Sequence, residues 1–123
     1  MKNKKNNKFL EAVVAHQPDV VEIDLRNTDV TDEGLGKLMN GCLQLHPDKV
    51  YSNKKGPEFL AAVANKHSDI TEIDLIWCDA VTDESLANLI NKCLNLHPDQ
   101  ILSKRKGNDF LNAVAKSHSD ITQ

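Results

Sequence analysis

The chain repeats itself at a period of about fifty residues, and this repeat limits the possible folds more than any other feature. FLEAVVAHQPDVVEIDL begins at Phe9, FLAAVANKHSDITEIDL begins at Phe59, and FLNAVAKSHSDITQ begins at Phe110. The offsets are 59 − 9 = 50 and 110 − 59 = 51 residues, with one inserted residue near Ala80. Such self-similarity is typical of repeat proteins, in which each unit covers the apolar face of its neighbour.

Each period contains one long and one short unit, and together these units predict a single repeat domain over residues 1–123. The units are a short half-unit at 1–19, a long unit at 20–45, a short unit at 46–69, a long unit at 70–96 and a short unit at 97–123. Runs of β-branched residues with alternating polarity predict strands at 21–25 and 71–75 in the long units. Shorter runs predict strands at 50–52 and 101–103 in the short units.

A helix is expected after each strand. In the long units, Thr31-Asp-Glu and Thr82-Asp-Glu open the helices, with Thr or Asp as the N-cap and acidic residues where the helix dipole favours them. Leucines and other apolar residues then recur at the spacing of one helical face. In the short units, Pro57 suits the first turn of a helix, and Asn108 is the expected cap of the equivalent helix. Strands that alternate with helices predict a parallel sheet with helices outside it.

The long units resemble leucine-rich repeats, specifically the cysteine-containing and ribonuclease-inhibitor-like subtypes. The residues that carry the resemblance in the second long unit are Ile70, Ile73, Leu75, Cys78, Val81, Thr82, Asp83, Glu84, Leu86, Leu89, Cys93, Leu94 and Leu96. In the first long unit they are Val20, Ile23, Leu25, Thr28, Val30, Leu35, Leu38, Cys42 and Leu45. Thr28 departs from the Asn or Cys usual at its position. The resemblance implies an α/β fold: a short right-handed β-α solenoid of about four parallel strands with helices on the convex side.

Composition excludes several classes of protein. The 123 residues are 40% hydrophobic and 27% charged, which is too apolar for a disordered chain. No apolar run is long enough to span a membrane, and the N-terminal residues lack the apolar stretch of a signal peptide. Three cysteines without a CxxC pair indicate reduced thiols. We therefore expect a cytoplasmic protein with no membrane partner, or one in a host cytosol if the chain is a secreted bacterial effector.

In the predicted solenoid, the polar positions of the strands face outward on the concave side and form the candidate partner-binding face. Its residues are Glu22, Asp24, Arg26, Lys49, Tyr51, Asn53, Glu72, Asp74, Ile76, Trp77, Gln100, Leu102 and Lys104. One interpretation is that neighbouring charges only satisfy one another across the sheet. The other is a binding face, because exposed aromatic and apolar residues amid charge are typical interface anchors. Trp77 also suits a buried structural position.

Other functional classes have weaker support. Lys54-Lys55 and Lys104–Lys106, with Lys2, Lys4 and Lys5 at the corresponding N-terminal place, suggest a basic edge that could contact phosphates. Because the chain has a net charge of −3 and no aromatic residues interleave these lysines, we do not expect nucleic acid as a partner. Cys42, Cys93, His46 and His97 recur in separate units, which argues against a metal site. No nucleophile with an orienting base is evident, so we expect no catalytic residue, no cofactor and no enzyme activity.

These observations predict a protein–protein interaction module that binds an unidentified protein through the concave face and adjacent loops. The resemblance implies adaptor-like use, and the Asn- and Lys-rich composition also suits a bacterial effector. A second hypothesis is a structural protein that forms homo-oligomers through its open sheet edges or terminal repeats.

Overall fold

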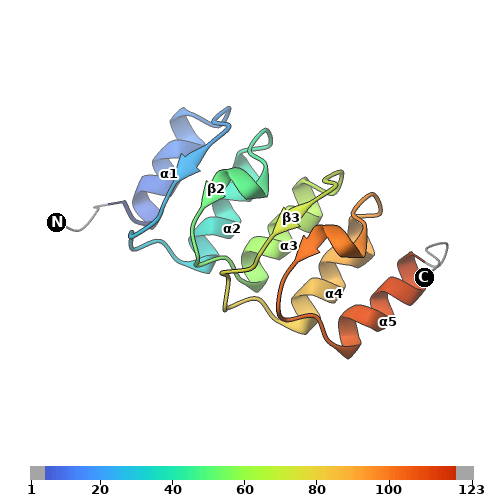
Figure 1. Ribbon diagram of the computed structural model, residues 1–123. Helices are drawn as coiled ribbons and strands as arrows, with labels where there is room; N and C mark the ends of the chain where they lie inside the picture. Colours follow the sequence, from blue (N-terminus) through green and yellow to red (C-terminus); the bar gives the residue numbers. More distant parts are fainter. Residues whose placement is uncertain (1–4, 119–123) are drawn as a thin grey trace.

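The computed structural model describes residues 5–118, which form mainly helices (Figure 1). Five α-helices of ten residues each are α1 (Asn7–His16), α2 (Asp32–Gly41), α3 (Pro57–Lys66), α4 (Asp83–Lys92) and α5 (Asn108–Ser117). Strands of two residues are β1 (Ile23–Asp24), β2 (Val50–Tyr51), β3 (Ile73–Asp74) and β4 (Ile101–Leu102). Two 3-10 helices, η1 (Pro47–Lys49) and η2 (Pro98–Gln100), precede β2 and β4.

The helices and the strands occupy two layers. The helices follow one another side by side from α1 to α5, and the strands lie across from them in the same order (Figure 1). Each helix packs against the next helix along the chain. The apolar side chains of the two layers meet between them.

The strands form two separate parallel pairs. β1 pairs with β2, with Ile23 opposite Val50, and β3 pairs with β4, with Ile73 opposite Ile101. The predicted fold class was therefore wrong: the described residues contain no sheet of four parallel strands, and the expected leucine-rich-repeat-like β-α solenoid is replaced by a mostly helical protein. The strands are also shorter than predicted: each has two residues, whereas runs of three to five residues were expected.

A side chain takes the place of the missing ladder between β2 and β3. The Asp48 carboxylate in η1 accepts the backbone N–H of Asp74 in β3 at 2.8 Å. An N–H that is satisfied by a carboxylate does not donate to a neighbouring strand, so the sheet stops there. The 3-10 turn also uses the residues just before β2 for local hydrogen bonds, such as that from Lys49 N–H to the His46 carbonyl at 2.9 Å.

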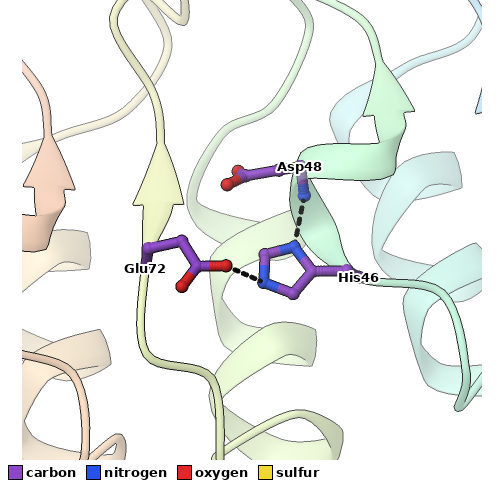
Figure 2. Close-up of side chains that lie close together, drawn as sticks. All are labelled: His46, Asp48 and Glu72. Atoms are coloured by element: carbon purple, nitrogen blue, oxygen red, sulfur yellow. Dashed lines mark hydrogen bonds and ion pairs between the residues drawn. The ribbon is translucent and has the colours of Figure 1, made fainter.

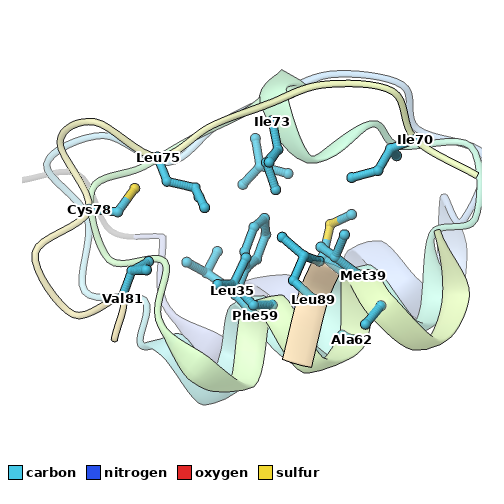
Figure 3. Close-up of a cluster of buried hydrophobic side chains, with 14 of the residues drawn as sticks. Leu35, Met39, Phe59, Ala62, Ile70, Ile73, Leu75, Cys78, Val81 and Leu89 are labelled. Atoms are coloured by element: carbon cyan, nitrogen blue, oxygen red, sulfur yellow. The ribbon is translucent and has the colours of Figure 1, made fainter. Parts of the chain in front are cut away.

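The core lies between the two layers (Figure 3). Leu35, Met39, Phe59 and Leu89 come from the helices and are fully buried, and Ile73 reaches them from β3. Each of them has a buried apolar counterpart in another copy of the repeat, as Leu35 has in Leu86 and Phe59 has in Phe110. One pattern of apolar residues therefore builds a continuous core along the row.

The helix ends show how neighbouring helices are joined. Of the two predicted alternatives, Thr or Asp, the threonines Thr31 and Thr82 cap α2 and α4, each accepting the N–H three residues later at 3.1 Å. The prediction for Asn108 was wrong, because α5 begins at Asn108 and Gly107 is the cap residue. The carboxylate of Asp83 in α4 accepts the N–H groups of Gly107, Asp109 and Phe110 at 2.8 to 3.0 Å. An acidic side chain of one helix thus caps the next helix.

Within residues 5–118, no helix combines the length and the apolar character that a membrane crossing requires.

Candidate functional site

A surface groove of about 530 Å³ opens where the two strand pairs separate. The strand ends on either side, at Tyr51–Asn53 and Asp74–Trp77, form its walls. Its lining residues are Arg26, Asn27, Asp48, Val50, Tyr51, Ser52, Asn53, Lys55, Asp74, Ile76, Trp77 and Cys78. The break in the sheet therefore coincides with a concave surface that is lined by residues of both strand pairs.

One wall carries a tight ion pair stacked on an aromatic ring. The Arg26 guanidinium donates two hydrogen bonds to the Asp24 carboxylate, at 2.9 and 2.8 Å. It also lies 5.6 Å from the centre of the Tyr51 ring, within the range of a cation–π contact. The hydrogen bonds from Arg26 hold the pKa of Asp24 well below its usual range. The hydroxyl of Tyr51 interacts with Glu22, and this hydrogen bond raises the pKa of Tyr51.

The other wall carries an exposed indole. Trp77 is 77% exposed, and the Lys104 ammonium lies 5.7 Å from the centre of its ring. Next to it, Ile76 is half-buried. The alternative in which Trp77 is a buried structural residue does not hold, because the side chain stands on the surface beside the groove.

The floor of the groove holds a buried cation. Lys55 is only 4% exposed; its ammonium donates to the Pro47 carbonyl at 2.9 Å and lies 5.2 Å from the centre of the Phe59 ring. Burial lowers the pKa of Lys55, and the nearby Asp48 and Asp74 partly oppose that shift. Burial also raises the pKa of Asp48, although its bond from the Asp74 N–H acts in the opposite direction.

A cluster of potential metal ligands lies beside the groove (Figure 2). One ligand atom from each of His46, Asp48 and Glu72 lies within 4.8 Å of the others. The histidine argues against a metal centre, however. His46 Nδ1 accepts the Asp48 N–H at 2.9 Å, so a neutral ring carries its proton on Nε2, which faces Glu72 at 3.3 Å. A metal on Nε2 would require that proton to move to Nδ1, which would break the turn.

The structure brings together six of the thirteen residues predicted for the partner-binding face. Those that line the groove are Arg26, Tyr51, Asn53, Asp74, Ile76 and Trp77. Two others touch lining residues: Asp24 pairs with Arg26, and Lys104 lies over Trp77. The remaining five lie outside the groove lining: Glu22, Lys49, Glu72, Gln100 and Leu102. Glu72, which was expected to face its charged neighbours in the sheet, lies beside His46 instead.

Lys55, Asp48 and Cys78 line the groove although sequence reasoning did not assign them to it. For Lys55 a signal exists, because Lys5, Lys55 and Lys106 each stand four residues before a repeat phenylalanine and lie over its ring at 5.2 to 5.5 Å. For Asp48 the signal is the recurrence of His-Pro-Asp at 46–48 and 97–99.

Several residues of the predicted basic edge bind other groups of the same chain. The ammonium groups of Lys55 and Lys106 donate to the carbonyls of Pro47 and Pro98 at 2.9 Å. Arg105 lies 3.7 Å from Asp79. Lys2 and Lys4 lie outside the described residues. Basic residues that stabilise their own turns are less available to an external phosphate.

The three cysteines are buried and free, and burial raises the pKa of each, that of Cys93 to about 11. Deprotonation to a thiolate is therefore disfavoured at neutral pH at all three positions.

No protein-family model matches the chain, and no curated protein is significantly similar to it. The resemblance to leucine-rich repeats therefore has no support beyond the residues that carry it.

Proposed function

We propose that the chain is a cytoplasmic protein-binding module and that the groove between β2 and β3 is its contact surface. The observation that carries the proposal is the position of Trp77, an exposed indole at the mouth of a preformed groove. Burying an aromatic side chain on a partner removes a large apolar area from water, and Trp is enriched among the residues that dominate interface energies.

The groove has the composition of an interface. Tyr51, Ile76 and Trp77 supply apolar surface, and Arg26, Asn53 and Asp74 add polar groups around it. Aromatic residues and arginine are enriched at protein interfaces, whereas a catalytic centre requires a nucleophile or base with matched partners. Protein recognition is therefore better supported than catalysis.

The test compares two exposed apolar residues of the chain. Tagged wild-type protein is used to capture partners from lysate, and each candidate is then purified and titrated against the protein. We expect Trp77→Ser to weaken binding at least tenfold, the loss of about 1.4 kcal/mol. Leu94→Ser is the control, because Leu94 is 64% exposed and is not part of the groove lining. Equal binding by both variants would contradict the proposal.

Self-association is a second candidate, favoured by a comparison of equivalent residues. Leu60 in α3 is 1% exposed, but its equivalent in α5, Leu111, is 61% exposed. An apolar side chain of this exposure could be covered by a second copy. Sedimentation over a range of concentrations tests this: wild type should associate and Leu111→Asp should remain monomeric.

A further inference from the structure

We propose that the groove recognises an arginine side chain of its protein partner and that the Asp74 carboxylate is the acceptor. This inference rests on the proposed function of the groove. It is drawn from the internal repeat, in which one half of the molecule already contains the arginine that the other half lacks.

The Asp24–Arg26 pair shows the geometry. Asp24 Oδ1 accepts the backbone N–H of Arg26 at 3.1 Å, which orients the carboxylate. The guanidinium of Arg26 then donates through Nε to Oδ1 and through Nη2 to Oδ2, at 2.9 and 2.8 Å. Such a bidentate arginine–carboxylate contact is stronger and more specific than a contact with a single hydrogen bond.

The second half keeps the acceptor and lacks the donor. Asp74 is the equivalent of Asp24, fifty residues later, and its Oδ1 accepts the N–H of Ile76 at the same distance of 3.1 Å. Ile76 stands in the place of Arg26, so no guanidinium is attached there. Among residues 5–118, no basic side chain lies within 4 Å of the exposed Asp74 carboxylate.

The basic residues near Asp74 are held elsewhere. Lys55 interacts electrostatically with Asp74, but its buried ammonium is hydrogen-bonded to the Pro47 carbonyl. Lys104 lies over the Trp77 ring, and Arg26 is bound to Asp24. The second carboxylate of the groove, Asp48, adds negative charge and is bonded to the Asp74 N–H.

The surroundings of Asp74 favour arginine over lysine. An arginine that enters the groove can place its methylene groups along Ile76 and its planar head near the Tyr51 and Trp77 rings, all of which line the groove. A guanidinium stacks on aromatic rings and matches both carboxylate oxygens, whereas an ammonium is a compact, strongly hydrated charge. The groove is therefore expected to prefer an arginine to a lysine at this point of the partner.

The experiment uses the whole chain and a defined probe, the peptide acetyl-Gly-Arg-Gly-amide. Binding is followed by the amide NMR shift of Ile76 and by the fluorescence of Trp77, the single tryptophan of the chain. The matched peptides carry citrulline, which has the shape of arginine without its charge, or lysine. We expect saturable binding of the arginine peptide in the millimolar range, at least tenfold weaker binding of the citrulline peptide, and intermediate binding of the lysine peptide.

Three variants and one control variant locate the contact. Asp74→Asn should reduce binding of the arginine peptide to that of the citrulline peptide. Ile76→Arg should also abolish binding, because it places a guanidinium on Asp74 as Arg26 does on Asp24. Ile76→Gln is its uncharged control: it removes the same isoleucine contact without adding a charge, and should weaken binding far less than Ile76→Arg. Arg26→Gln frees Asp24 and should add a second bound peptide.

The outcomes separate this inference from the proposed function. Equal binding of the arginine and citrulline peptides, no binding of either, or unchanged binding by Asp74→Asn and Ile76→Arg would overturn the arginine site. A protein partner that depends on Trp77 but not on Asp74 would leave the proposed function intact and overturn the inference alone. A partner that is indifferent to both residues would overturn the proposed function.

Discussion

Asp48 is the residue on which the separation of the two strand pairs depends. Its carboxylate accepts the Asp74 N–H, and this bond joins the first half of the molecule to the second. Asp99 holds the equivalent position but its side chain is 87% exposed. We expect Asp48→Ala to lower the free energy of unfolding by about 0.5–1.5 kcal/mol, the usual net value of a hydrogen bond whose donor water can reach once the acceptor is lost. Asp99→Ala should change it by less than about 0.5 kcal/mol. Urea unfolding of both variants measures the difference, and equal effects would contradict this role.

The charge of Asp48 makes a separate prediction about pH. Because burial raises its pKa in the folded protein, the folded state binds the proton more tightly than the unfolded chain does. Its contribution to stability is then highest below the ordinary carboxyl pKa of about 4 and falls as the pH rises through the folded-state pKa. Asp48→Asn keeps an acceptor and removes this titration. The stability of the asparagine variant relative to wild type should therefore increase between pH 4 and pH 7 in urea unfolding; a constant difference would show that burial does not matter there.

At the scale of elements, one helix caps the next. Burial alone would raise the pKa of Asp83, but the N–H groups of Phe110, Asp109 and Gly107 outweigh it and lower the pKa. Asp83→Ala should speed amide hydrogen exchange at these three residues at the start of α5. Asp32→Ala is the matched variant and should act instead on Gly56, Glu58 and Phe59 in α3. The lowered pKa of Asp83 means that the folded protein favours its charged form. The protection at α5 should therefore be present at neutral pH and be lost as the pH falls below about 4 and the carboxylate is protonated. Exchange that is the same in both variants would exclude separate caps.

The helices of this fold could be predicted from the sequence, but the pairing of its strands could not. Apolar periodicity predicted the helices correctly, and the Thr-Asp-Glu sequence limited the cap of α2 to Thr31 or Asp32, because both signals are local. Strand pairing is not local: the run at 50–52 has the composition of a strand, yet the side chain of Asp48 occupies the donor that a wider sheet would need. Six predicted face residues still meet in one groove, although only Tyr51 and Asp74 among them lie in strands. Lys55 was not assigned to the site because a lysine in a turn is normally solvated, and only the fold shows it buried.

At the scale of the whole molecule, stability should depend on position in the row of helices. α3 packs between α2 and α4, and α5 packs against α4 alone among the described helices. Leu60 and Leu111 are equivalent residues in these two helices, 1% and 61% exposed. Leu60→Ala leaves a cavity in the centre of the core and should cost about 2–5 kcal/mol, whereas Leu111→Ala removes a side chain that is already largely in water and should cost less than about 0.5 kcal/mol. Urea unfolding followed by circular dichroism compares the two variants under the same conditions. Equal losses would mean that Leu111 is covered in solution, which is the result that self-association through α5 would produce, and the loss for Leu111→Ala should then grow with protein concentration.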